Sequence, residues 1–155
     1  WIFQRMAVEF MILLDFINIC STTDIARIHY AQECLQKIAD RLHKAPEAFD
    51  INEFLVTDLS MHRIWFQVTD KLCLWENLVR PQADYSRFIR LDVVGGRNVP
   101  DVMKEHQQLI EIIEARDFAA IEPLLKRHLY GGVRRMGSEL FSEEYQRFFT
   151  SSSRE

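Results

Sequence analysis

Four side chains of kinds that commonly bind metal ions fall on the apolar faces of three expected helices. Asp58 and His62 are four residues apart, which places them one turn apart on one helical face together with Trp65. His106 and His128 share the apolar stripes of two later helices in the same way. Burying an unpaired carboxylate is costly, so Asp58 needs a partner. A divalent metal held by three imidazoles and one carboxylate would satisfy all four groups.

A metal-free core is the alternative to this hypothesis. A single inward histidine is more often a hydrogen-bonded core residue than a metal ligand, so the three imidazoles could simply hydrogen-bond one another. The remaining two histidines provide a contrast. His29 lies at the edge of its apolar stripe and His43 lies off it, so we expect both on the surface.

Arginines could complete a binding site for an anion. Arg5 and Glu9 are four residues apart on a first helix that is apolar on nearly every side, and Arg80 and Arg87 bracket Pro81. The simpler interpretation is a structural Arg5–Glu9 ion pair, with the two later arginines in solvent. A guanidinium that faces inward beside a metal would instead bind a carboxylate, because its fork matches two oxygens.

The elements that must position these residues are helices. Only five Gly and four Pro occur among 155 residues, 48% of which are hydrophobic, and this favours one all-helical domain over a sheet fold. No glycine-rich phosphate-binding motif is present. The hydrophobic spacing predicts six or seven helices, at about 2–19, 25–42, 51–69, 71–95 with a kink at Pro81, 100–115, 117–129 and 139–149, before a polar tail at 151–155.

Local sequence also predicts where several helices begin and end. Residues 21–24 (Ser-Thr-Thr-Asp) supply N-cap chemistry for the second helix, and Asp117 caps a later one. Pro100 suits the first turn of the helix that carries His106. The glycine pairs at 95–96 and 131–132 are expected to end the helices that precede them.

Charge and cysteine content limit the environment and the partners. The net charge of −4 gives no basic surface for a phosphate backbone, so nucleic acid would be bound by a segment outside this sequence. Cys20, Cys34 and Cys73 show no CxxC spacing, which fits a reducing compartment and a cytoplasmic protein. The apolar run at 6–20 contains Glu9 and Asp15 and is too short to span a bilayer, so no membrane partner is expected.

The spacing of the candidate ligands resembles the FCD domain, the C-terminal effector-binding domain of the FadR branch of the GntR transcription regulators. The family has an Asp-x3-His on one helix, a Glu-His that opens a later helix ending in Ala-Arg-Asp, and a His-Leu 22 residues beyond that histidine. The matching segments here are Asp58–His62, Glu105-His106 with Ala115–Asp117, and His128-Leu129, with further likeness at Arg5-x3-Glu9 and Tyr85–Phe88. The resemblance covers nearly the whole sequence.

This resemblance implies an antiparallel bundle over residues 1–150, built around a central cavity. It implies a divalent ion, zinc or nickel, on Asp58, His62, His106 and His128. A small organic acid would complete the coordination through its carboxylate. Its other oxygens would be bound by Arg5 and Arg87, or by Arg80 as the weaker candidate.

The resemblance also implies partners beyond the effector. Members form homodimers and bind operator DNA through an N-terminal winged helix, and no such segment precedes the first helix in this sequence. The expected role is therefore that of the sensing half of a repressor or activator. Two departures from the family, Met61 before the first histidine and Asp70-Lys71 in the loop that follows, concern packing and the turn rather than the ligands.

The rival interpretation is a helical metal-dependent hydrolase that uses the same Asp and His residues. Open positions on the metal could activate water. A general base is harder to find, because Glu105 is adjacent to His106 and points about 100° away from it on a helix. Glu9 is the other inward carboxylate, and Arg5 is expected to occupy it. The sequence thus favours a sensor over an enzyme.

Overall fold

A computed structural model describes residues 2–79 and 98–136, with side chains as far as residue 131. The described residues form six α helices and one short 3-10 helix and contain no strand, so the all-helical prediction is confirmed. The elements are α1 (Ile2–Ile19), α2 (Thr22–Lys44), η1 (Pro46–Ala48), α3 (Ile51–Val68), α4 (Leu72–Val79), α6 (Val99–Ala115) and α7 (Phe118–Met136).

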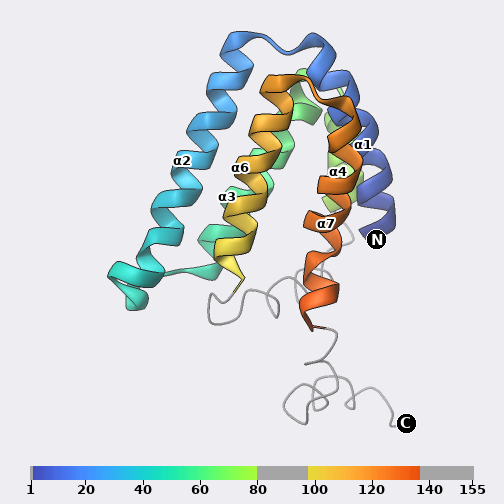
Figure 1. The fold of residues 1–155 in the computed structure, drawn as a ribbon. Coiled ribbons are helices and arrows are strands. Elements are labelled where there is room, and N and C mark those ends of the chain that lie inside the picture. Colours follow the sequence, from blue (N-terminus) through green and yellow to red (C-terminus); the bar gives the residue numbers. More distant parts are fainter. Residues whose placement is uncertain (1, 80–97, 137–155) are drawn as a thin grey trace, which may run out of the picture.

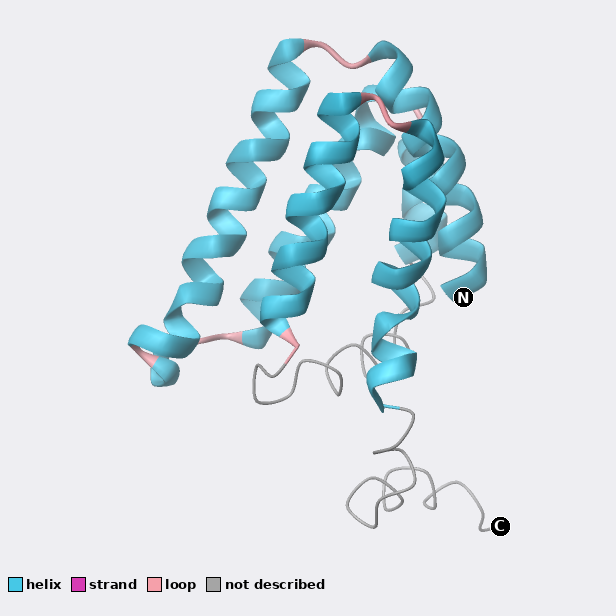
Figure 2. Ribbon diagram, in the orientation of Figure 1, coloured by secondary structure: helices cyan, strands magenta, loops and turns pink. Residues whose placement is uncertain are grey.

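The long helices are arranged side by side as a closed bundle (Figure 1). Helix α6 packs between α2 and α7, α7 packs against α1, and α3 contacts both α1 and α2. Short α4 covers α3 and α1. Short connections join α1 to α2 and α6 to α7 at the same end of the bundle (Figure 2). Consequently α3, α6 and α7, which carry the candidate ligands, all face one interior.

Polar caps fix where three of these helices begin. Ser21 and Asp24 form a capping box, in which the Asp24 amide donates to Ser21 Oγ at 3.2 Å and the Ser21 amide donates to Asp24 Oδ2 at 2.9 Å. Asp50 Oδ1 accepts the Asn52 amide at 2.7 Å at the start of α3. Asp117 Oδ1 accepts the Ala120 amide at 3.3 Å, as the sequence predicts for the start of α7.

The predicted end of α7 is wrong. The helix continues through Gly131 and Gly132 to Met136. A glycine inside a helix costs about 1 kcal/mol relative to alanine but does not by itself stop the hydrogen-bond ladder. Many helices end at a left-handed residue, and α6 does so at Arg116, whose φ is 53°.

Other predictions fall outside the described residues. These are the kink at Pro81, the helix end at Gly95-Gly96, the helix at 139–149 and the polar tail at 151–155. Within the described residues the fourth helix is observed only as α4.

The core contains large apolar side chains from α1 and α3, among them Phe16, Phe54, Trp65 and Phe66, all of them almost fully buried. Several polar residues are buried with them: Arg5, Glu9, Asp58, His62, Thr69, Glu105 and His106. This concentration of ionisable groups inside an apolar bundle makes the interior the candidate functional site. Among the helices described, none combines the length and apolar character that crossing a membrane requires.

Candidate metal centre

Four potential metal ligands from three helices meet inside the bundle. Asp58 and His62 come from α3, His106 from α6 and His128 from α7. One ligand atom of each lies within 4.8 Å of the others, so the structure brings together the whole set that the sequence nominates. The first three are buried and the side chain of His128 is 10% exposed.

The ligand atoms have the spacing of a shared coordination sphere. His62 Nε2 lies 3.2 Å from His106 Nε2 and 3.3 Å from His128 Nε2. Asp58 Oδ1 lies 3.1 Å from His106 Nε2 and 3.9 Å from His62 Nε2. Zinc holds nitrogen and oxygen ligands at about 2.0–2.2 Å, which separates tetrahedral ligands by roughly 3.3 Å. A small divalent ion therefore fits among these four atoms.

Two buried carboxylates contact the outer nitrogens of two of the rings. Glu9 Oε1 contacts His62 Nδ1 and also accepts the Trp65 indole N–H at 3.1 Å. Glu105 Oε2 lies 3.0 Å from His128 Nδ1. A carboxylate can only accept at this position, so it places the proton of a neutral imidazole on Nδ1. The Nε2 atoms of both rings then carry lone pairs that face inward.

A cation between them would satisfy these facing lone pairs. The His62 and His128 rings are stacked, with their planes 7° apart, and as neutral rings they cannot hydrogen-bond each other across the 3.3 Å between their Nε2 atoms. Asp58 Oδ1 accepts no hydrogen bond from any described residue, because the 3.1 Å approach of His106 Nε2 does not have hydrogen-bond geometry. Either a proton on one ring or a metal ion shared by all four residues would resolve this conflict.

The protonation states around the cluster suit metal binding. Burial opposes ionisation of Asp58, yet the neighbouring His106, His62 and His128 rings outweigh it and hold its pKa well below the usual value. Burial is likewise outweighed at Glu9, where His62 and Arg5 lower the pKa to about 2. At His128 burial lowers the pKa to about 4 despite the bond to Glu105. At neutral pH the carboxylates are charged and His128 is neutral, as coordination requires.

The arginines predicted to bind an effector are only partly described. Arg5 is buried, its Nε donates to Glu9 Oε2 at 2.9 Å, and its guanidinium carbon lies 5.9 Å from the centre of the Trp75 ring. The simpler prediction of a structural Arg5–Glu9 pair is therefore confirmed, and Glu9 joins that pair to His62. Arg80 and Arg87 lie outside the described residues.

The other two histidines lie away from the cluster. His29 Nε2 contacts Glu114 Oε1 at 2.6 Å, and both side chains are nearly half exposed. His43 is exposed near the end of α2. Both surface predictions are confirmed.

Sequence reasoning missed the part that Glu105 plays. Its position next to His106 suggests a side chain pointing away from the site, but the carboxylate lies behind the His128 ring, at Nδ1. It is therefore on the opposite side of that ring from the meeting point of the Nε2 atoms. The available signal was its spacing of four from the core residue Leu109, which places Glu105 on a buried stripe.

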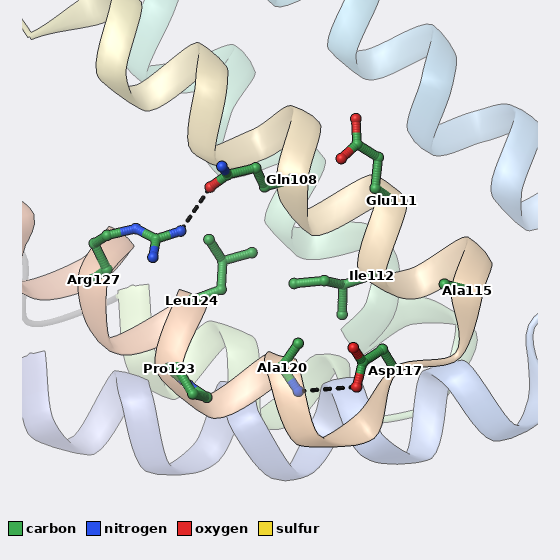
Figure 3. A pocket seen from close by; sticks show the side chains of 9 residues that line it. All are labelled: Gln108, Glu111, Ile112, Ala115, Asp117, Ala120, Pro123, Leu124 and Arg127. Atoms are coloured by element: carbon green, nitrogen blue, oxygen red, sulfur yellow. Dashed lines mark hydrogen bonds between the residues drawn. The ribbon is translucent and has the colours of Figure 1, made fainter.

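A groove of about 530 Å³ opens on the outside of α6 and α7 (Figure 3). Its lining residues are Gln108, Glu111, Ile112, Ala115, Asp117, Ala120, Pro123, Leu124 and Arg127. Arg127 Nη2 donates across it to Gln108 Oε1 at 2.6 Å (Figure 3). The groove contains none of the four candidate ligands, and Arg127 connects it to the interior because its Nε lies 3.8 Å from Glu105 Oε1.

Comparison with known families gives one match that covers most of the chain. The model of the FCD domain matches residues 5–131, a range that includes all four candidate ligands as well as Glu9 and Glu105. Comparison with curated proteins and with solved structures found no match.

Proposed function

The chain belongs to the FCD domain family, and from this premise we propose that it senses a small organic acid through a divalent metal ion in a GntR-type transcription regulator. FCD domains are regulatory, effector-binding domains of that class of regulator. Their regulatory role favours a sensor over the metal-dependent hydrolase that the same residues could otherwise build. The observation that carries the proposal is the convergence of Asp58, His62, His106 and His128 within 4.8 Å.

In this proposal the four residues of the cluster are the metal ligands. Three imidazole nitrogens and one carboxylate oxygen form a donor set that suits zinc or nickel. The ion would supply a Lewis-acidic position that accepts the carboxylate of the effector. Support comes from the inward lone pairs of His62 and His128 and from Asp58 Oδ1, which has no hydrogen-bond donor among the described residues.

Arginine would provide the second half of effector recognition. Arg5, Arg80 and Arg87 are the candidates, because a guanidinium binds a carboxylate through two parallel hydrogen bonds. Arg5 is buried beside the Glu9–His62 pair, so the Glu9 carboxylate and the His62 ring separate it from the proposed metal along this chain of contacts. Arg87, with Arg80 as the weaker candidate, remains a prediction from the sequence.

Effector binding would regulate the binding of DNA by a winged-helix domain that is attached to this domain in a homodimer. The acid can change DNA affinity only if it binds one arrangement of the dimer more tightly than another. This role and the free cysteines at positions 20, 34 and 73 would suit a cytoplasmic location.

The test combines metal analysis with calorimetry. The purified chain is expected to contain or take up one zinc or nickel ion, and the loaded protein to bind at least one acid from a panel of small carboxylates. The His106→Ala/His128→Ala double variant should lose both properties, while His43→Ala, at an exposed position, should keep them. Equal metal content and acid binding in the double variant would refute the proposal.

A further inference from the structure

Two of the three inward histidines are each held by a glutamate that an arginine contacts in turn. The first chain of contacts runs from Arg5 through Glu9 to His62. The second runs from Arg127 through Glu105 to His128, with 3.8 Å between Arg127 Nε and Glu105 Oε1 and 3.0 Å between Glu105 Oε2 and His128 Nδ1. His106 differs, since its Nδ1 has no hydrogen-bond partner among the described residues.

The two chains differ in their access to water. The Arg5 and Glu9 side chains are 2% and 0% exposed, whereas Glu105 is 9% exposed and Arg127 is 50% exposed. Arg127 stands on the wall of the α6–α7 groove, where it also donates to Gln108 (Figure 3). Water and salt can therefore weaken the outer contact of the second chain but not that of the first.

We propose that Glu105 is a positioning residue that fixes the tautomer and direction of His128, and that Arg127 supports Glu105 from the rim of the α6–α7 groove. The metal-binding part of this inference rests on the proposed function. By accepting a hydrogen bond from Nδ1–H, Glu105 keeps the Nε2 lone pair of His128 directed at the other ligands. Among the described contacts, this support reaches a half-exposed side chain at Arg127.

The main variant is Glu105→Gln, which keeps the size of the side chain. A glutamine amide can either accept from Nδ1 or donate to it, so it no longer selects one tautomer of His128. The matched control is Glu111→Gln, which removes the same charge from an exposed position on the same helix. Glu111 accepts a hydrogen bond from Gln107 and contacts none of the ligands in the described structure.

The first measurement is the imidazole nitrogen NMR spectrum of the metal-free protein. His128 is expected to carry its proton on Nδ1 in the wild type and in Glu111→Gln, and to show a mixture of tautomers in Glu105→Gln. Thermal unfolding of each variant identifies a general loss of folding. An unchanged His128 tautomer in a folded Glu105→Gln protein would overturn the inference.

The second measurement is titration with Co²⁺, whose visible absorption reports the ligand geometry. Glu105→Gln should weaken Co²⁺ binding by roughly 10- to 100-fold and change the absorption bands, as loss of an outer partner of a ligand does. Arg127→Ala should give a smaller loss with the same sign, and Arg127→Lys should recover part of it. Affinity and bands equal to those of Glu111→Gln would count against Glu105. If the wild type binds no Co²⁺, the proposed function fails, while the tautomer measurement still decides the inference.

Discussion

The carboxylate of Asp58 is buried beside three imidazoles and has no hydrogen-bond donor to Oδ1 among the described residues. The free-energy cost of burying such a charge is offset only when its lone pairs accept a hydrogen bond or contact a cation. The same holds for the Nε2 lone pairs of His62 and His128, which lie 3.3 Å apart. At the scale of single residues, the interior is therefore least stable when no cation is present.

Metal binding should therefore stabilise the fold measurably. Zinc at about one hundred times its Kd is expected to raise the free energy of unfolding by about 2.7 kcal/mol, because it binds only the folded state. Denaturant unfolding with zinc and with a chelator measures the difference. Asp58→Asn, which removes the charged ligand and keeps the shape, should lose most of the gain.

The control for this experiment is His43→Ala. It removes an exposed imidazole that is not one of the four candidate ligands, so this variant should keep the full zinc effect. A wild-type unfolding curve that is the same with zinc and with chelator would favour the alternative of a hydrogen-bonded core without metal.

The four candidate ligands could be predicted from the sequence, but the residues that contact them could not. Asp58, His62, His106 and His128 could be nominated because helical spacing alone fixes which face a residue occupies. The contact between Glu105 and His128 could not, since it depends on side-chain torsion angles and on the approach of α6 to α7. Arg5 was open to two interpretations for the same reason, and the structure supports the pair with Glu9.

Among the helices, α2 begins at the most complete cap. The hydroxyl of Ser21 accepts the Asp24 amide, and the Asp24 carboxylate accepts the Ser21 amide. Both residues are at the junction between α1 and α2, so this cap also determines where the chain turns back along the bundle. The cap lies outside the buried ionisable cluster, and its contribution to stability can be measured separately.

Ser21→Ala should destabilise the fold by about 1 kcal/mol, because it leaves the Asp24 amide without its capping acceptor. Chemical denaturation at neutral pH measures this loss. Ser60→Ala is the control, since the Ser60 hydroxyl donates to the Val56 carbonyl within α3 and caps nothing. A loss in Ser60→Ala as large as that in Ser21→Ala would contradict the assignment of the cap.

The stabilisation that this cap provides should depend on pH. Hydrogen bonds from the backbone and the hydroxyl of Ser21 lower the pKa of Asp24 below its ordinary value of about 3.9. The unfolded chain therefore binds the proton more readily, and the stabilisation is complete above about pH 4 and is lost as the pH falls through the folded-state pKa. The difference in stability between wild type and Asp24→Asn should accordingly be full at pH 6 and shrink below pH 4.

The observed helix boundaries show which local sequence signals are sufficient to predict where a helix begins or ends. Ser21 and Asp117 were predicted as helix starts because a polar side chain next to an apolar stripe has a specific use there. The glycine pair at 131–132 was misjudged, since glycine permits a left-handed turn without requiring one. Conversely, Asp70 and Arg116 adopt positive φ values of 57° and 53° although neither is a glycine, the residue that adopts such values most readily.

At the scale of the whole molecule, the first helix has two unlike sides. Its inner side carries Arg5 and Glu9 into the core, while Phe3 and Met11 are 71% and 58% exposed. If they belong to one apolar patch, such side chains would suit a contact with another protein. We therefore expect α1 to contribute to the proposed homodimer.

Met11→Lys should therefore weaken dimerisation, because it places a charge in an apolar contact, and sedimentation equilibrium should show a shift toward monomer. Val56→Lys is the matched control, since Val56 on α3 is 64% exposed and no dimer contact is expected there. The expectation fails if the wild type is monomeric, or if both variants dimerise as strongly as the wild type.

The convergence of Asp58, His62, His106 and His128 on one point also limits how this domain can evolve. Losing any one of the four leaves the others with lone pairs directed into a crowded interior, so a lone substitution is harmful before a second can repair it. Descendants of this gene should keep the set whole or replace it together with apolar or mutually hydrogen-bonding side chains. A centre of this kind is inherited as one character, although it is encoded at four separate places in the gene.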